Sequence, residues 1–138
     1  MEGSSREQQN VAAVRALWSA SRHGGTDDAI ARLEPDAEWR LHIYPGRVLT
    51  TPEFADTLRH IERDRRVTSA ELHQVEADGD FVVAAGSFRW TADDGGIIDF
   101  RGYWVYECAG GRIVAGESFA DWSDALDAFS VRVADQAF

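Results

Sequence analysis

Three side chains in this sequence have the chemistry of a base, a nucleophile or an acid at positions where a site could form. Histidine ordinarily titrates near neutral pH, so His42 could act as a general base, although strict strand alternation would point it away from its apolar neighbours. Ser118 has no identifiable base partner in the sequence, so a hydrogen bond to a ligand is its simpler role. Asp121 precedes a helical pattern, and its spacing to Ser123 and Asp124 suits a helix cap.

The residue types that hold metals and cofactors are not grouped along the chain. His23, His60 and His73 are scattered without the spacing of a metal-ligand set. Cys108 is the single cysteine, so no internal disulfide can form and the cysteine pairs of a zinc site are absent. We therefore expect no metal and no cofactor, and Cys108 is most simply a core residue.

Three long apolar segments must position any site that these residues form. A strand of 11 residues, the length of the first segment, spans roughly 36 Å and rarely stays straight. Glycine inside a strand usually marks a bulge, a bend or a close approach by a ligand or another backbone. The segments are 81–91, 97–108 and 112–120, and their central glycines are Gly86, Gly102 and Gly116.

Hairpin register decides which side chains of these segments share a face, because a slip of one residue inverts every side chain. Loops of three and five residues are ordinary where glycine adopts a left-handed conformation, so we expect odd-length loops at 92–96 and 109–111. The pairs expected from these loops are Gly86 with Gly102, Trp104 with Gly116, and Gly102 with Ser118.

In this register the three glycines lie on one face, as the floor of a trough with aromatic walls. Small residues on a curved face leave a volume that helical side chains must fill or leave open, so a small-molecule pocket is the hypothesis we prefer. The wall residues are Ala84, Phe88, Trp90, Phe100 and Tyr106, and the opposite, more polar face carries Arg89, Asp99, Arg101, Tyr103, Glu107 and Glu117.

Two alternatives remain open at this point. The glycines could merely accommodate helix packing, with the aromatic residues forming core. A register slip of one residue would instead bring Glu117 and Arg101 into the hollow, together with Asp99 and Tyr103. A carboxylate desolvated among aromatic rings would have a raised pKa, and the hollow would then resemble an enzyme site.

The remaining pattern predicts helices before and after these strands. Apolar residues at spacings of three and four predict a helix that starts after Ser4 or Ser5 and ends at Gly24. A second helix is expected at 27–33, a strand at 36–44 and a third helix capped by Thr51. A further strand begins near Val67, and a short helix closes the chain. This order predicts an α+β fold with helices on one face of a mostly antiparallel sheet.

Composition limits the class of protein and its partners. With 138 residues the chain fits a single domain, 1–138, and 44% apolar residues suffice for a core. A formal net charge of −10 repels nucleic-acid phosphates, so we expect no nucleic-acid partner, and no membrane partner for the same reason. The polar start of the chain lacks the layout of a secretion signal, which predicts a cytoplasmic protein.

Several motifs resemble the SnoaL-like branch of the nuclear-transport-factor-two-like superfamily, whose fold is a cone of helices on a curved sheet. The resemblance covers nearly the whole chain. It implies that the N-terminal helices pack on the concave face of the sheet. The motifs are Pro35-Asp36-Ala37-Glu38-Trp39, Gly79-Asp80-Phe81-Val82, Gly111-Arg112-Ile113-Val114, Ser118-Phe119-Ala120-Asp121 and Ala125-Leu126.

The family includes polyketide cyclases, ketosteroid isomerases and limonene epoxide hydrolases, and the resemblance places their ionisable positions on different residues here. The strand position of the isomerase base falls on Leu41, and the last-strand aspartate of the epoxide hydrolases falls on Ser118. Their long-strand aspartate and arginine fall near Phe88 and Gly86. Asp121 alone matches a family aspartate, the one just before the closing helix.

Function is accordingly expected to be binding of a small hydrophobic molecule. The alternative is a cofactor-free cyclase, isomerase or hydrolase that acts on a polyketide, steroid or terpenoid-like substrate. A homodimer through the outer sheet face is also expected, and a purely structural domain would need a filled hollow. The expected ligand-binding residues are Trp39, Leu41, Phe88, Trp90, Phe100, Gly102, Trp104 and Ser118, and the candidate catalytic residues are His42, Ser118 and Asp121.

Overall fold

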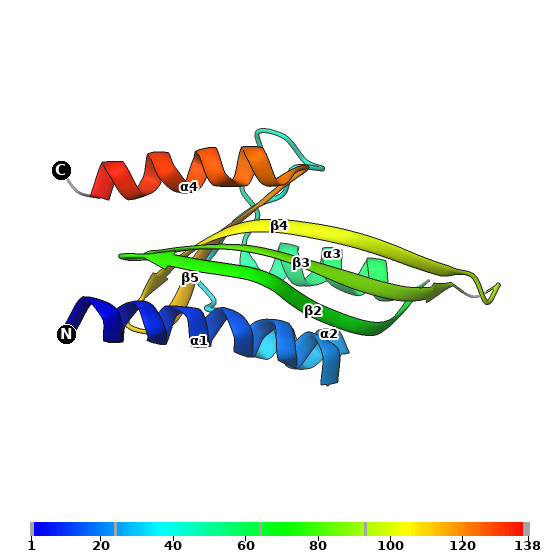
Figure 1. Ribbon diagram of the computed structural model, residues 1–138. Coiled ribbons are helices and arrows are strands. Elements are labelled where there is room, and N and C mark those ends of the chain that lie inside the picture. Colours follow the sequence, from blue (N-terminus) through cyan, green and yellow to red (C-terminus); the bar gives the residue numbers. More distant parts are fainter. Residues whose placement is uncertain (1, 24, 64, 93, 137–138) are drawn as a thin grey trace.

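The computed structural model describes residues 2–23, 25–63, 65–92 and 94–136. Within these ranges helices lie on both sides of one five-stranded sheet, which is curved and not closed (Figure 1). The elements in chain order are α1 (Glu2–His23), α2 (Gly25–Ala31), β1 (Glu38–Arg40), α3 (Thr51–Arg63), β2 (Arg65–Asp78), β3 (Phe81–Ala92), β4 (Ile97–Ala109), β5 (Arg112–Phe119) and α4 (Trp122–Gln136).

The sheet is a meander with one added strand. Its order is β1-β5-β4-β3-β2, and β1 pairs with β5 in parallel while the other neighbours are antiparallel. Two register shifts in β2, after Val67 and after Leu72, add a residue to this edge strand each time. Bulges of this kind bend a strand and increase its twist, so they let the long strands curve around the helices. The predicted α+β class, with a curved and mostly antiparallel sheet, is confirmed.

The register of the first long hairpin agrees with the prediction, and that of the second differs. Gly86 lies opposite Gly102 across the five-residue loop. In the second hairpin Trp104 lies opposite Ser118, so the pairs predicted there were wrong by two residues. A shift of two keeps the same face, and all three glycines do lie on the concave side.

Two features of the second hairpin, a shorter turn than predicted and a β-bulge, offset each other. Gly110 and Gly111 both have positive φ, at 59° and 78°, and form a two-residue turn between Ala109 and Arg112. Such an even loop would invert the face of every β5 residue. A bulge in β5 then adds one residue, because Glu107 pairs with Ala115 while Cys108 pairs with Ile113. The bulge restores the original parity.

Element boundaries correct four further predictions. β1 ends at Arg40, well before the predicted end at residue 44, because the chain turns there and Tyr44 N–H donates to Leu41 C=O at 2.9 Å. Thr50, one residue before the predicted cap, caps α3 and forms a reciprocal capping box with Glu53. α1 already includes Glu2, and α2 starts at Gly25 and ends at Ala31.

The closing helix α4 covers part of the sheet face opposite α1, as Figure 1 shows. It is 15 residues long, so the prediction of a short helix was wrong. Val105 is fully buried beneath it, and the Tyr103 and Trp122 rings lie 6.2 Å apart. Arg132 of α4 forms an ion pair with Glu117. Glu117 therefore faces outward, on the face where it was predicted.

Burial of Cys108 leads to a prediction about alkaline stability. Its side chain is 2% exposed on the concave side, and desolvation raises the pKa of the thiol from 9.0 to about 12. A group whose pKa is higher in the folded state stabilises the fold below its unfolded pKa and loses that contribution as the pH rises through the folded value. We expect the free energy of unfolding to fall as the pH rises from 9.0 to about 12.

Urea denaturation across this pH range measures the effect, with Cys108→Ala as the comparison. The variant should lose less stability than the wild type over the same range, because the thiol no longer ionises. Burial also raises the pKa of Tyr106, so a smaller decline should persist in the variant. Equal pH slopes for both proteins would contradict the prediction.

Candidate functional site

The inner half of the concave face is filled by Trp18 from α1. Its indole lies over Gly86, where an added Cβ would stand 2.6 Å from Cζ3. The ring stacks on Phe88 with centroids 4.6 Å apart, and its Nε1–H donates to the Tyr106 hydroxyl at 3.0 Å. Gly86 therefore provides space for a core tryptophan, and this part of the trough is closed to ligands.

Trp39 fills the trough in the same way above Gly116. The side chain is 0% exposed, and an added Cβ at Gly116 would stand 2.5 Å from its Cζ3. Trp39 stacks on Phe54 of α3 at 4.4 Å and meets Trp104 edge-on at 6.2 Å, and its Nε1–H donates to Thr51 Oγ1 at 3.2 Å. The tryptophan that the sequence assigned to ligand contact is thus enclosed within the core.

Exposed apolar surface lies in the outer half of the concave face, from Gly102 toward the tip of the β3–β4 hairpin. An added Cβ at Gly102 would meet Phe88 and Trp104 at 3.6 Å and Trp18 at 3.7 Å, all ordinary contact distances. Farther along the same face of β4, Phe100 is 41% and Ile98 is 38% exposed. The hairpin that carries them extends beyond the helices (Figure 1). We call the surface formed by Phe88, Ile98, Phe100, Gly102 and Trp104 the outer trough.

Trp104 supplies a polar group to the outer trough. Its ring stacks on Tyr106 with centroids 5.5 Å apart, and its Nε1 lies 3.6 Å from the Cβ position of Gly102. Trp18 and Trp39 both donate their indole N–H groups to side-chain oxygens, whereas the Trp104 N–H has no hydrogen-bond partner among the described residues. An indole N–H that is partly removed from water gains from a hydrogen-bond acceptor. A ligand carbonyl or hydroxyl could supply one.

A serine and a histidine meet at the side of the trough formed by β5. Ser118 is 7% exposed and lies opposite Trp104 in the β4–β5 register. Its Oγ lies 2.8 Å from His42 Nδ1 and accepts the His42 backbone N–H at 3.1 Å. The sequence offered no base for Ser118 because the pair joins residues 76 positions apart. A turn after β1 brings His42 to the serine, where strict alternation would have pointed it away.

The other expected site residues have separate positions. Leu41 is 7% exposed and belongs to the core, and the side chain of Trp90 lies outside the described part of the structure. Asp121 accepts the Asp124 N–H at 2.8 Å and caps α4. Arg101 pairs with Ser87 on the outer face of the sheet, so the described strands bring neither Arg101 nor Glu117 to the trough.

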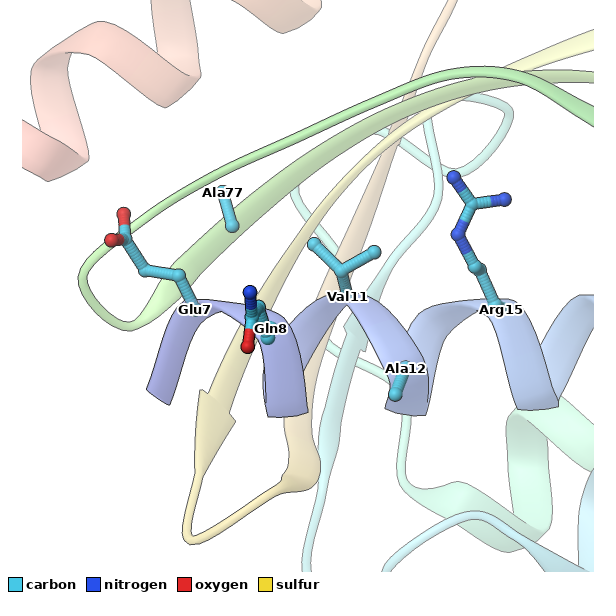
Figure 2. Close-up of a pocket in the computed structure, with 6 residues that line it drawn as sticks. All are labelled: Glu7, Gln8, Val11, Ala12, Arg15 and Ala77. Carbon is cyan, nitrogen blue, oxygen red and sulfur yellow. The ribbon is translucent and has the colours of Figure 1, made fainter. Parts of the chain in front are cut away.

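A hollow of about 450 Å³ lies on the surface between α1 and the end of β2, away from the outer trough. Figure 2 shows Glu7 and Arg15 at its two ends, with Val11 between them and Ala77 across from α1. The apolar floor is small, because Val11, Ala12 and Ala77 are its only apolar lining residues among those that the structure describes. The hollow has neither the aromatic side chains nor the partly buried indole N–H of the outer trough, so it is the weaker ligand site.

The described ranges contain no group of three or more histidine, cysteine or carboxylate side chains that could hold a metal ion. No helix in those ranges is long and apolar enough to cross a membrane.

An open, curved sheet with three helices on its concave face and aromatic side chains between them defines the class of α+β cone folds. The chain belongs to the SnoaL-like domain family, which matches residues 11–116. Comparison with curated proteins gives no significant match.

Similar solved structures have this cone fold at low sequence identity. A candidate SnoaL-like polyketide cyclase from Jannaschia sp. CCS1 is 18% identical, with 91% of this chain and 94% of that chain covered and a TM-score of 0.69. An LEH-like epoxide hydrolase from M. tuberculosis is 19% identical, with coverages of 90% and 91% and a TM-score of 0.67. TerC, co-crystallized with polyporic acid, is 19% identical, with coverages of 88% and 97% and a TM-score of 0.64. At these identities the likeness shows the fold alone.

Proposed function

We propose that the protein binds a small, largely apolar molecule with a hydrogen-bond acceptor in the outer trough. The observation that carries this proposal is the unpartnered Trp104 N–H beside Gly102, on the same face as the exposed Phe100 and Ile98. Concave apolar surface with a few directed polar groups is the usual composition of small-molecule sites. Aromatic walls favour flat or ring-containing ligands.

Catalysis is the second candidate function, as a cofactor-free cyclase, isomerase or hydrolase of a polyketide, steroid or terpenoid-like substrate. An LEH-like epoxide hydrolase and TerC, which was co-crystallized with polyporic acid, have a similar fold, and this likeness supports a small-molecule substrate. The specific observation that favours catalysis is the Ser118–His42 contact. Asp99 and Arg101 lie on the outer face, and Glu117 pairs with Arg132, so they do not supply an acid or base to the trough.

A matched pair of ligands tests the binding proposal. Tetralin and 1-tetralone have the same ring system and differ by one carbonyl group, the expected acceptor for the Trp104 N–H. Titration followed by tryptophan fluorescence should show saturable binding of both, with the ketone bound about fivefold more tightly, equivalent to roughly 1 kcal/mol for one hydrogen bond. Trp104→Phe should remove the preference for the ketone. No response to either compound, or to larger ring systems of the same kind, would contradict the proposal.

We also propose that the part of the outer sheet face not covered by α4 forms a homodimer. Ile97 is 67% exposed there, next to the Arg89–Asp99 ion pair. Apolar area beside charges of both signs suits a two-fold interface in which the same patch meets itself.

Sedimentation at micromolar concentration should therefore give about twice the 15.3 kDa chain mass. Ile97→Asp should shift the protein to monomer, because it places a charge at an apolar contact. Glu107→Gln, a change on the same face near the other end of β4, should leave the protein a dimer. Sedimentation of the wild type as a monomer would contradict the dimer.

A further inference from the structure

We propose that Ser118 and His42 form a nucleophile and base pair that accepts an acyl group from an apolar ester bound in the outer trough. The inference rests on the proposed ligand site, because the ester must be held there by its apolar part. It assigns a substrate class, esters of apolar carboxylic acids, and a covalent intermediate on Ser118.

Hydrogen bonding at the serine oxygen fixes the direction of the proton. The His42 backbone N–H donates to Ser118 Oγ at 3.1 Å and occupies one lone pair of the oxygen. The hydroxyl hydrogen can then point to His42 Nδ1, 2.8 Å away, in the tautomer that carries its proton on Nε2. A base within hydrogen-bond reach of a hydroxyl is the arrangement that activates a serine nucleophile.

The position of the pair relative to the outer trough distinguishes it from a chance contact. Ser118 lies on the concave face, opposite Trp104, whose unpartnered N–H faces the Gly102 side of the trough. His73 and Ser87 make a similar contact, Nε2 to Oγ at 2.7 Å, but Ser87 pairs with Arg101 on the outer face. Of these two serine–histidine contacts among the described residues, the one at Ser118 adjoins the proposed ligand surface.

The reaction is an acyl transfer in which all atoms and protons balance. Ser118 Oγ attacks the ester carbonyl carbon while its proton passes to His42 Nδ1. The bond from that carbon to the leaving oxygen breaks, and the leaving alcohol takes the proton from the imidazolium. Water then hydrolyses the acyl-serine with His42 as base, releasing the carboxylic acid. No redox step or cofactor is involved.

The second half of this reaction should be slow. No carboxylate bonds to Nε2 of His42 within the described part of the chain, so the imidazolium lacks the third group of a triad. Loss of the triad aspartate in a serine protease lowers kcat by about 10⁴-fold. Acyl-Ser118 should consequently accumulate after a burst of released alcohol.

p-Nitrophenyl hexanoate tests the inference with the intact chain. The expected result is a burst of p-nitrophenol equal to the protein concentration and a hexanoyl adduct on the peptide that contains Ser118, detected by mass spectrometry. Ser118→Ala should abolish the adduct, and His42→Gln, which keeps the backbone N–H, should slow its formation at least tenfold. Ser87→Ala is the matched control and should acylate like the wild type.

Binding of 1-tetralone, measured in the same variants, separates this inference from the proposed function. Intact ketone binding without an adduct on Ser118 would overturn the acyl transfer and leave the binding site in place. An adduct that persists in Ser118→Ala, or that is lost in Ser87→Ala, would also overturn it. If the wild type does not bind the ketone, the ligand site and this inference are both rejected.

Discussion

Gly116→Ala should lower the free energy of unfolding by about 1–3 kcal/mol, the usual cost of overpacking a core. The new Cβ would stand 2.5 Å and 2.8 Å from two carbons of the Trp39 ring. That ring cannot easily move, because Phe54 stacks on one side and Nε1–H is bonded to Thr51. Urea denaturation of the two proteins measures the difference.

Gly102→Ala provides the matched control in the neighbouring strand. Its Cβ would meet only contacts of 3.6 Å or more, and positive φ does not require glycine at this position. Alanine is less flexible than glycine in the unfolded chain, so the change should be neutral or stabilise the fold by up to about 1 kcal/mol. In a Trp39→Phe background, Gly116→Ala should cost less than in the wild type. Equal effects of the two alanines would contradict the filled inner half.

Gly102→Leu should weaken ligand binding and raise Kd by about 100-fold or more, equivalent to roughly 2.8 kcal/mol. The leucine side chain would project from the concave face beside Phe88 and the Trp104 N–H, where we place the ligand. Fluorescence titration with 1-tetralone measures the loss of binding, and near-ultraviolet circular dichroism checks that the aromatic core is retained.

Glu107→Leu is the control for this change, because it adds the same side chain to the same strand on the opposite, exposed face. It should leave Kd within about twofold of the wild type, since surface changes away from a site have small effects. Ketone binding that survives Gly102→Leu would show that the ligand lies elsewhere on the molecule.

Strand positions and their shared face could be predicted from the sequence because turn residues and alternation are local signals. Gly79-Asp80 and the loop before Ile97 fix the first two turns, and the register of the β3–β4 pair follows from the length of that loop. The β4–β5 pairing could not be derived in the same way. A two-residue turn and a β-bulge act together there. The Gly110-Gly111 pair is a signal for the turn, but the bulge leaves no clear sequence signal.

Long-range packing explains why the site itself was only partly predicted. The trough residues were identified from alternation, but whether Trp18 or Trp39 fills the trough depends on how α1 and β1 approach the sheet. The glycines thus differ: a Cβ at Gly86 or Gly116 would clash with a core tryptophan, whereas a Cβ at Gly102 would make only ordinary contacts. Ser118 and His42 are in contact because β1 ends at Arg40 and the chain turns there. The end of a strand is among the features that are hardest to predict from a sequence.

The central claim is that the inner half of the concave face is filled and that the outer trough binds a ligand through Trp104. Indole N–H resonances in an ¹H–¹⁵N NMR spectrum test it most directly, with each peak assigned by a tryptophan-to-phenylalanine variant. On addition of 1-tetralone the Trp104 peak should shift, while the peaks of Trp18 and Trp39, bonded to Tyr106 and Thr51, should stay in place. Shifts at Trp18 or Trp39 with an unchanged Trp104 peak would contradict the account.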